Sequence, residues 1–107
     1  MERTQLAGHD NLVHKGDFLV LGGTSYELEG ILDGSVLVKD GARLIIRGIF
    51  HGRLAVEPSG TVEVHGIAKL SDSDCDGPVS VSGILDGAVA VRRLNAKPGS
   101  VIDGVRQ

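Results

Sequence analysis

The residues best suited to chemistry lie near position 75, where carboxylates recur at every second residue. Asp72, Asp74 and Asp76 are separated by single residues and are followed by Gly77. This order matches the first half of a D-x-D-x-D-G calcium loop, in which alternating carboxylates converge on a hard cation and glycine permits the sharp turn. A complete loop also needs a bidentate carboxylate at its twelfth position, and that position here is Gly83.

A missing ligand could come from elsewhere in the chain, for example from Asp40 or Asp86, but no sequence pattern brings either carboxylate to this loop. We therefore predict an irregular polar loop from Ser71 to Pro78, with no metal and no other cofactor. The loop contains the single cysteine, Cys75. Its acidic neighbours disfavour the thiolate, so the sequence does not predict a nucleophile here.

The four histidines do not form a recognisable metal or catalytic site either. They are scattered, and we expect each at an outward position of a strand or in the N-terminal tail: His9, His14, His51 and His65. No nucleophile is paired with a base, and no glycine-rich phosphate loop precedes a helix. The chain also lacks the long loops with clustered carboxylates that an enzyme of the polysaccharide lyase kind would need. We predict that the protein has no catalytic residues and is not an enzyme.

The elements that carry these residues are set by an internal repeat of about eighteen residues. The pair Gly-Ile begins four successive segments, and the intervals between these pairs are 18, 18 and 17 residues. The pairs start at Gly30, Gly48, Gly66 and Gly83. Counting back by the same interval predicts a degenerate first copy that begins at Leu12. A fixed period of this length is typical of a solenoid.

Apolar and polar residues alternate within each repeat, as in V-E-V-H and V-S-V-S. A period of two indicates strands with one buried face, and the high β-branched content favours strand over helix. The three prolines fall in the predicted turns: Pro58, Pro78 and Pro98. Aromatic residues make up only 3% of the chain, so the core must consist of aliphatic side chains.

A fixed period also predicts how the strands are connected, because like residues stack on like only if each turn lies on the previous one. Eighteen residues at roughly 3.3 Å each give a perimeter of about 60 Å, enough for three short sides. A left-handed coil would need an aliphatic residue every six positions, and stepping from Ile31 reaches Arg43 and Thr61. We therefore predict an all-β fold, a right-handed parallel β-helix of about five turns.

The bulk composition limits the partners and the location. We expect residues 1–11 to be an N-terminal tail or a cap on the first turn, and residues 12–107 to be the β-helix domain. A formal net charge of −3 argues against nonspecific binding of nucleic acid. No apolar run is long enough to span a membrane, and a lone cysteine fits a reducing compartment. We predict a cytoplasmic protein.

The recurring pattern G-I-x-x-G-x-[VL]-x-V, with glycines at the corners, resembles the bactofilins. The resemblance extends from about Leu12 to Gly104, which is nearly the whole chain. Bactofilins are bacterial cytoskeletal proteins that form polymers and have a right-handed β-helix core. The resemblance implies a structural protein that associates with itself end to end, without bound nucleotide.

The repeat itself leads to a compatible expectation, because the ends of a coil present unpaired backbone groups and an uncovered core. After Gly104 only three residues remain, Val105 to Gln107, which we expect to be too few to cover the end. The residues predicted to carry self-association are apolar positions of the first and last turns: Val13, Phe18, Val20, Val101 and Val105.

A protein-binding module is the alternative function. An immunity or antitoxin-type protein could use one rigid side of the coil to block a partner protein, and the short chain and acidic charge suit this role equally well. The predicted loop from Ser71 to Pro78 would be the contact, since irregular segments on regular scaffolds often carry function.

Overall fold

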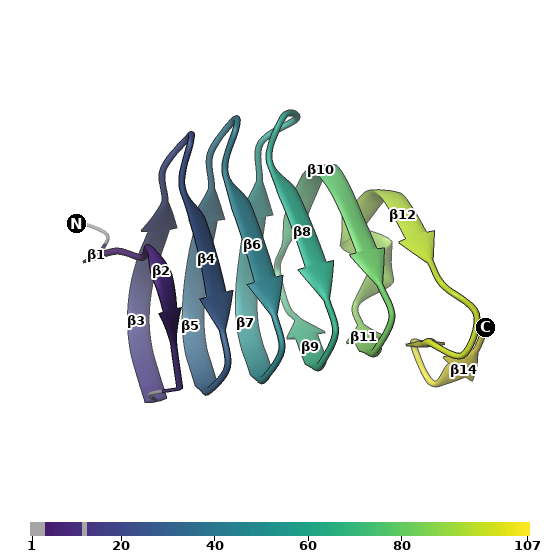
Figure 1. Ribbon diagram of the computed structural model, residues 1–107. Helices are drawn as coiled ribbons and strands as arrows, with labels where there is room; N and C mark the ends of the chain where they lie inside the picture. Colours follow the sequence, from purple (N-terminus) through teal and green to yellow (C-terminus); the bar gives the residue numbers. More distant parts are fainter. Residues whose placement is uncertain (1–3, 12) are drawn as a thin grey trace.

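The computed structural model describes residues 4–11 and 13–107 and shows one continuous coil of short strands (Figure 1). Its fourteen described strands belong to a single sheet, and a short 3₁₀ helix, η1 (Ala88–Ala90), interrupts the last coil. The strand pairs are parallel with one exception, β13 with β14. The predicted all-β solenoid of about five coils is therefore confirmed.

Each regular coil consists of an eight-residue strand with a corner near its middle, a four-residue turn and a four-residue strand. The second coil shows this unit as β5 (Ile31–Val38), the turn 39–42 and β6 (Arg43–Ile46). Repetition of the unit produces three faces. The first face contains the first halves of the long strands β3 (Val13–Val20), β5 and β7 (Ile49–Val56), followed by β9 (Ile67–Leu70), β11 (Ile84–Asp86) and β13 (Val101–Ile102).

The other two faces contain the remaining strands. The second face holds β1 (Thr4–Gln5), the second halves of β3, β5 and β7, and the start of β10 (Asp74–Val81). The third face holds β2 (Gly8–Asp10), β4 (Ser25–Leu28), β6, β8 (Thr61–Val64), the end of β10 and most of β12 (Val91–Ala96). The short strand β14 (Val105–Arg106) lies beside β13 at the end of the first face.

The coil is right-handed. In Figure 1 the nearer strands β4, β6 and β8 run downward, the fainter strands β5 and β7 run upward, and the chain advances from left to right. This is the handedness of nearly all crossovers between parallel strands in one sheet.

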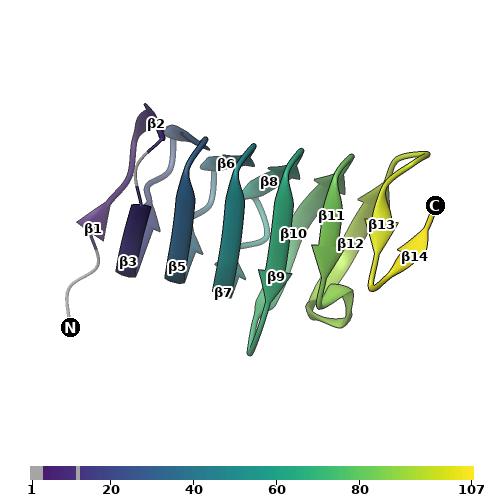
Figure 2. The same ribbon diagram turned by 90° about the horizontal axis from the view of Figure 1, so that it is seen from below.

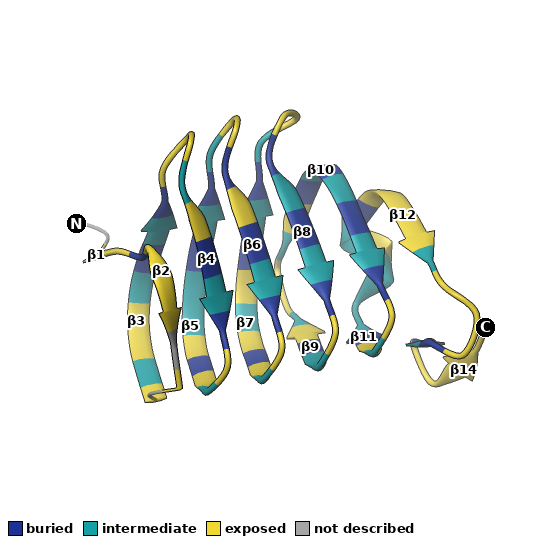
Figure 3. Ribbon diagram, in the orientation of Figure 1, coloured by how far each residue is buried: buried dark blue, intermediate teal, exposed yellow. Residues whose placement is uncertain are grey.

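Inward side chains form columns along the coil, because each strand lies in register on the strand one coil earlier. One column contains Leu32, Phe50, Ala68, Leu85 and Ile102, and each of these residues is at most 9% exposed. Parallel columns supply the rest of the core (Figure 3): Phe18, Val36 and Leu54; Val20, Val38, Val56 and Cys75; Tyr26, Leu44, Val62 and Val79; Leu28, Ile46, Val64 and Val81. Small aliphatic residues predominate, as the low aromatic content predicts.

The fourth coil departs from the regular pattern in two places that nearly cancel. One residue is inserted at the first corner, because Gly52 aligns with Leu70 whereas Ala55 aligns with Asp74. Two residues are missing from the next turn, because Val56 aligns with Cys75 whereas Val62 aligns with Val79.

Between β9 and β10, only residues 71–73 lie outside the strands. The predicted irregular loop from Ser71 to Pro78 is therefore wrong beyond Ser73, and Pro78 lies within β10 rather than in a turn. The hydroxyl of Ser73 accepts a hydrogen bond from the backbone N–H of Leu54 at 2.9 Å, which replaces part of the interrupted backbone ladder.

Glycine is required where the corners of successive coils meet. Gly16, Gly34 and Gly52 are aligned at the first corner and have φ values of 128°, 152° and 141°. A Cβ at Gly52 would overlap the carbonyl oxygen of Gly34, whereas a Cβ at Gly16 would meet no atom within 4 Å. Both positions therefore have a strained backbone, but only at Gly52 does the backbone of the previous coil leave no room for a side chain.

We predict that Gly52→Ala destabilises the protein more than Gly16→Ala. The left-handed backbone alone costs about 1–3 kcal/mol in either variant. The overlap with Gly34 adds to this cost only at Gly52, so the total loss should exceed about 4 kcal/mol there. Urea unfolding followed by circular dichroism measures both values, and equal losses would contradict the close packing of the corners.

Candidate interaction surfaces

The three aspartates of the partial calcium motif do not converge. Cys75 points into the core between Asp74 and Asp76, so their spacing is the ordinary alternation of a strand. Arg92 contacts both carboxylates, at 3.5 Å from Asp74 and 2.8 Å from Asp76. Asp72 lies on the bulge 3.7 Å from Arg53. Within residues 4–11 and 13–107 no three acidic, histidine or cysteine side chains are grouped so that they could hold a metal ion.

Cys75 is fully buried in the core. Burial, together with the negative charges of Asp74 and Asp76, raises the pKa of its thiol to about 12. The thiol therefore stays protonated throughout the physiological pH range, and its environment is that of a core residue.

The histidines occupy several kinds of position, and one of them differs from the prediction. His9 lies 3.7 Å from Glu29, and His51 lies 3.5 Å from Asp33, so both are surface residues. His14, however, aligns with the buried Leu32 and its ring meets Phe18 edge-on with a centroid distance of 5.5 Å. His14 is thus an inward residue of the coil that begins with β3, because the alternation along this strand, in register with β5, places it on the core side.

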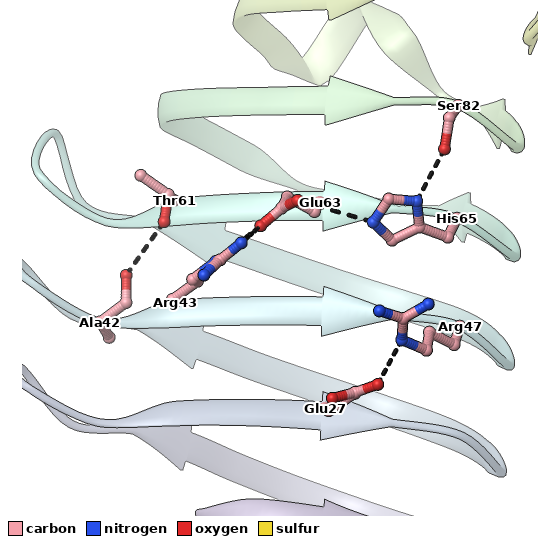
Figure 4. A network of polar contacts seen from close by, with 8 residues as sticks. All are labelled: Glu27, Ala42, Arg43, Arg47, Thr61, Glu63, His65 and Ser82. Carbon is pink, nitrogen blue, oxygen red and sulfur yellow. Dashed lines mark hydrogen bonds and ion pairs between the residues drawn. The ribbon is translucent and has the colours of Figure 1, made fainter.

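The outside of the third face carries a polar network (Figure 4). Arg43 on β6 forms an ion pair with Glu63 on β8, one coil later. His65 lies 3.5 Å from the other oxygen of Glu63, and its Nδ1 is 2.8 Å from the hydroxyl of Ser82. The hydrogen bond from Arg43 holds the pKa of the Glu63 carboxyl below its ordinary value of 4.5, against the opposing effect of burial. The network links three consecutive coils side by side.

We predict that Glu63→Gln lowers the free energy of unfolding at pH 7 and that the difference from wild type disappears as the pH falls. A lowered pKa means that the ion pair contributes its full stability above the ordinary carboxyl pKa and loses it as the pH falls through the folded-state value. Because the pair is partly exposed, the difference at pH 7 should be at most about 1 kcal/mol. Denaturant unfolding at pH 7 and pH 3 measures it. In an Arg43→Gln background the pH-dependent difference should be absent, and its persistence would show that Arg43 is not the cause.

The C-terminal end of the coil is partly covered, which corrects the expectation that residues 105–107 are too few to do so. β14 folds back antiparallel on β13, with Ile102 aligned with Val105 (Figure 2). Gln107 extends this pairing, because its N–H donates to the carbonyl of Ser100 and its carbonyl accepts from Gly99. A tight turn through Asp103 and Gly104, both with positive φ, makes the reversal possible.

At this end the described residues leave the third face uncovered. β12 pairs with β10 on one side, and no described strand pairs with its other edge. Leu94 aligns with the fully buried Val79 yet is 37% exposed, because the described chain places nothing beyond it. Leu94 is therefore a core position that faces the end of the coil. Sequence reasoning missed it because the repeat loses its regular pattern from Arg92 onward.

At the N-terminal end the described residues continue the coil. β1 pairs with the second half of β3, and β2 pairs with β4. Between these strands Leu6 is only 6% exposed, and its N–H donates to the carbonyl of Leu19. Residues 4–10 therefore lie on the second and third faces like a further, partial coil. On the first face, no described strand pairs with the outer edge of residues 13–16.

The five residues predicted to carry self-association lie in different environments. Phe18 and Val20 are 6% and 0% exposed, with β1 beyond them, so neither is available for contact. Val101 is half-buried between β11 and β14. Val13 and Val105 are more than 60% exposed, on the first face and on β14 respectively. Only Val13 and Val105 thus retain the exposure that the prediction requires.

The isoleucine of each Gly-Ile pair lies on the outside of the first face rather than in the core. The residue that follows it points inward, as Leu32 does after Ile31. Successive coils align these side chains into one outer column, which we name the aliphatic column: Val13, Ile31, Ile49, Ile67, Ile84 and Val101. The Gly-Ile repeat is the signal that marks this column in the sequence.

The described part of the chain encloses no pocket. It also contains no helix long and apolar enough to cross a membrane. The described surfaces that carry exposed strand edges or exposed aliphatic side chains are the two ends of the coil and the aliphatic column.

These features define a small right-handed β-solenoid whose inward columns are aliphatic and whose first face carries a further aliphatic column outside. Comparison with family models, with curated proteins and with solved structures finds no match for the chain.

Proposed function

We propose that the protein is a structural scaffold, bactofilin-like in its role, that assembles end to end through its terminal coils. Assembly needs no nucleotide, metal or catalytic residue, because it consists of strand pairing and burial of apolar surface. The buried Cys75 thiol and the absence of other cysteines suit a cytoplasmic location.

The observation that carries this proposal is the edge of β12 together with Leu94. A six-residue strand whose outer edge has no described partner offers unpaired N–H and C=O groups to another chain. Leu94 adds an incompletely buried core position to the same end. Joining a second copy here would satisfy the backbone groups and cover the leucine.

The opposite end supplies a matching surface. Both ends expose strands of a parallel sheet that run in the same direction around the coil, so a head-to-tail contact continues the parallel pairing from one copy to the next. On the third face this contact would bring β12 of one copy against β2 of another. The repeat of about eighteen residues would then extend across the junction.

The position of β14 adds a condition. β14 occupies the place on the first face where the first half of β3 of a following copy would have to lie. A junction that continues all three faces therefore requires residues 105–107 to leave β13. Only two residue pairs and the hydrogen bonds of Gln107 hold them there, and Val105 is 62% exposed, so little apolar surface opposes their release.

We predict that wild-type protein assembles into species larger than a dimer and that the Leu94→Lys variant does not. A lysine in the junction would place an unpaired charge against the core of the next copy. Analytical ultracentrifugation at increasing concentration, with negative-stain microscopy, measures the change. Leu21→Lys is the matched control, since Leu21 has the same exposed fraction of 37% but lies in the turn between β3 and β4. A wild-type protein that shows no such species would contradict the proposal.

Removal of residues 105–107 should have the opposite effect. The variant exposes the edge of β13, so we expect larger assemblies than wild type forms at equal concentration, and at least a severalfold lower concentration for their onset. Sedimentation velocity of the two proteins, with circular dichroism to verify the fold, makes the comparison. If the truncated protein assembles less than wild type, β14 takes part in the junction rather than covering it.

The alternative function is a module that binds a partner protein through one rigid side of the coil, with the segment from Ser71 to Pro78 as its candidate contact. That segment is a strand from Asp74 onward, where Asp74 and Asp76 are paired with Arg92. No described feature favours this function over self-assembly.

A further inference from the structure

The outside of the first face carries two columns that run side by side along the whole coil. The aliphatic column is one of them, with Val13 64%, Ile31 42%, Ile49 40% and Ile84 37% exposed. Two residues further along lies a second column, which we name the charged column: Lys15, Asp33, His51, Lys69 and Asp86, continued by Asp103 in the turn after β13. Figure 2 shows the strands that carry both columns as a row from β3 to β13.

A continuous row of exposed β-branched residues needs an explanation, whereas single exposed apolar residues do not. The isoleucines recur in register in coil after coil while polar residues occupy most other outward positions of the same strands. The row is straight because the parallel ladder fixes one residue directly over the next. A partner for it must be linear and must repeat with the spacing of the coils, which a second copy of this chain satisfies.

Two symmetric arrangements place the first faces of two copies against each other. A two-fold axis parallel to the coil axis overlaps the two faces fully only when it lies between the columns, and it then lays the aliphatic column of one copy across the charged column of the other. A two-fold axis perpendicular to the coil axis keeps each column opposite its own kind and makes the two coils antiparallel. The second arrangement buries the isoleucines against isoleucines, so it is the one that apolar burial favours.

The order of charges selects the register of this antiparallel pair. With the axis through Ile49, Lys15 lies opposite Asp86 of the second copy, and Asp33 lies opposite Lys69 of the second copy. Each pair occurs twice by symmetry, which gives four attractive contacts. Lys15, Lys69 and Asp86 have no ion-pair partner among the described residues of their own chain, so they are available for these contacts.

A shift by one coil fits less well. Lys15 would then lie opposite Asp103, whose carboxylate already accepts hydrogen bonds from the backbone N–H groups of Gly87 and Ala88. The same shift would bring Asp33 against Asp86, which is repulsive. In the register with Ile49 on the axis, Arg47 would lie close to Arg47 of the second copy. Its guanidinium, however, is paired with Glu27 on the third face.

We propose that the first face is a self-complementary interface, through which two copies of the chain pair laterally and antiparallel with Ile49 on the two-fold axis. The contact covers about four residues by five coils, roughly 13 by 24 Å, and so buries well below the ~800 Å² per partner of a standard interface. The pair is therefore weak and salt-sensitive, and it forms at high protein concentration without help from the end-to-end junction.

Cross-linking tests the geometry without requiring a tight dimer. Ile49→Cys and Val13→Cys each place one reactive thiol in the aliphatic column. Wild type is the control that should not cross-link, because its single cysteine, Cys75, is fully buried. In the proposed pair the residues at position 49 face each other, whereas the two residues at position 13 are about four coils, or ~19 Å, apart along the axis. A short bis-maleimide, applied at high protein concentration, should cross-link Ile49→Cys at least tenfold more than Val13→Cys.

Val13 is the more exposed of the two residues, so random collisions would give the reverse order. A mixture of Val13→Cys with Ile84→Cys should yield the mixed dimer, because these positions face each other in the proposed register. Equal cross-linking of Ile49→Cys and Val13→Cys would indicate a parallel pair and overturn the proposal, and no cross-linking of Ile49→Cys would also overturn it.

Charge reversal provides a second readout. Lys15→Glu should reduce cross-linking of Ile49→Cys severalfold, and Asp86→Lys added to it should restore the yield, since the two residues face each other. The outcome is separable from that of end-to-end assembly, because Leu94→Lys alters only the terminal junction and should leave Ile49→Cys cross-linking unchanged. Loss of cross-linking in the Leu94→Lys background would mean that the lateral contact exists only within end-to-end assemblies, and would overturn it as an independent interface.

Discussion

Backbone hydrogen bonding between successive coils is the constraint on which the rest of this structure depends. In the regular coils each strand bonds in parallel register to the strand one coil earlier. The register leaves no freedom in where a side chain lies relative to its equivalent one coil earlier. Inward residues must therefore tolerate identical neighbours above and below, which aliphatic side chains do, and corner residues must accept the previous backbone, which glycine alone does at Gly34 and Gly52.

The same constraint acts on the outer surface, where it converts local sequence preferences into long rows. An exposed isoleucine in one coil is a minor feature, but its repetition under a fixed register creates the aliphatic column. Opposite charges likewise meet across coils, as in the pair of Arg43 with Glu63. The outer rows and the strand edges at the ends are different kinds of surface, since the first offers side chains and the second offers backbone groups. A small solenoid thus has one direction in which it can extend and another in which it can pair.

Much of the fold could be predicted from the sequence because the period is a global property that survives local irregularity. The intervals of 18, 18 and 17 residues between Gly-Ile pairs set the coil length, and the alternation of apolar residues set the strands. Alternation alone does not say which of two adjacent apolar residues points inward. Ile31 and Leu32 are both apolar, and only the ladder and the corner at Gly34 place Leu32 in the core.

The candidate surfaces were harder to predict than the fold. Phe18 and Val20 belong to the first copy of the repeat, but β1 and Leu6 lie beyond them and bury them. Residues 4–10 lack the repeat pattern, so the sequence does not predict that they extend the coil. The reversal of β14 depends on two positive φ values, at Asp103 and Gly104, in a stretch where a glycine could equally have marked another corner. Leu94 became apparent only once the register of β12 was known. The pairing of Arg92 with Asp74 and Asp76 likewise joins residues whose proximity follows from the same register.

The irregular fourth coil has a consequence for how such a chain can change its length. An inserted residue at the corner after Leu70 and two missing residues before Val79 lie within one lap, and the columns on either side of them remain aligned. Each change in length is therefore absorbed at the corner where it occurs, because the strands before and after that corner remain aligned with the previous coil. Solenoids of this kind can acquire new surface loops one lap at a time, provided that each lap ends where the previous one did.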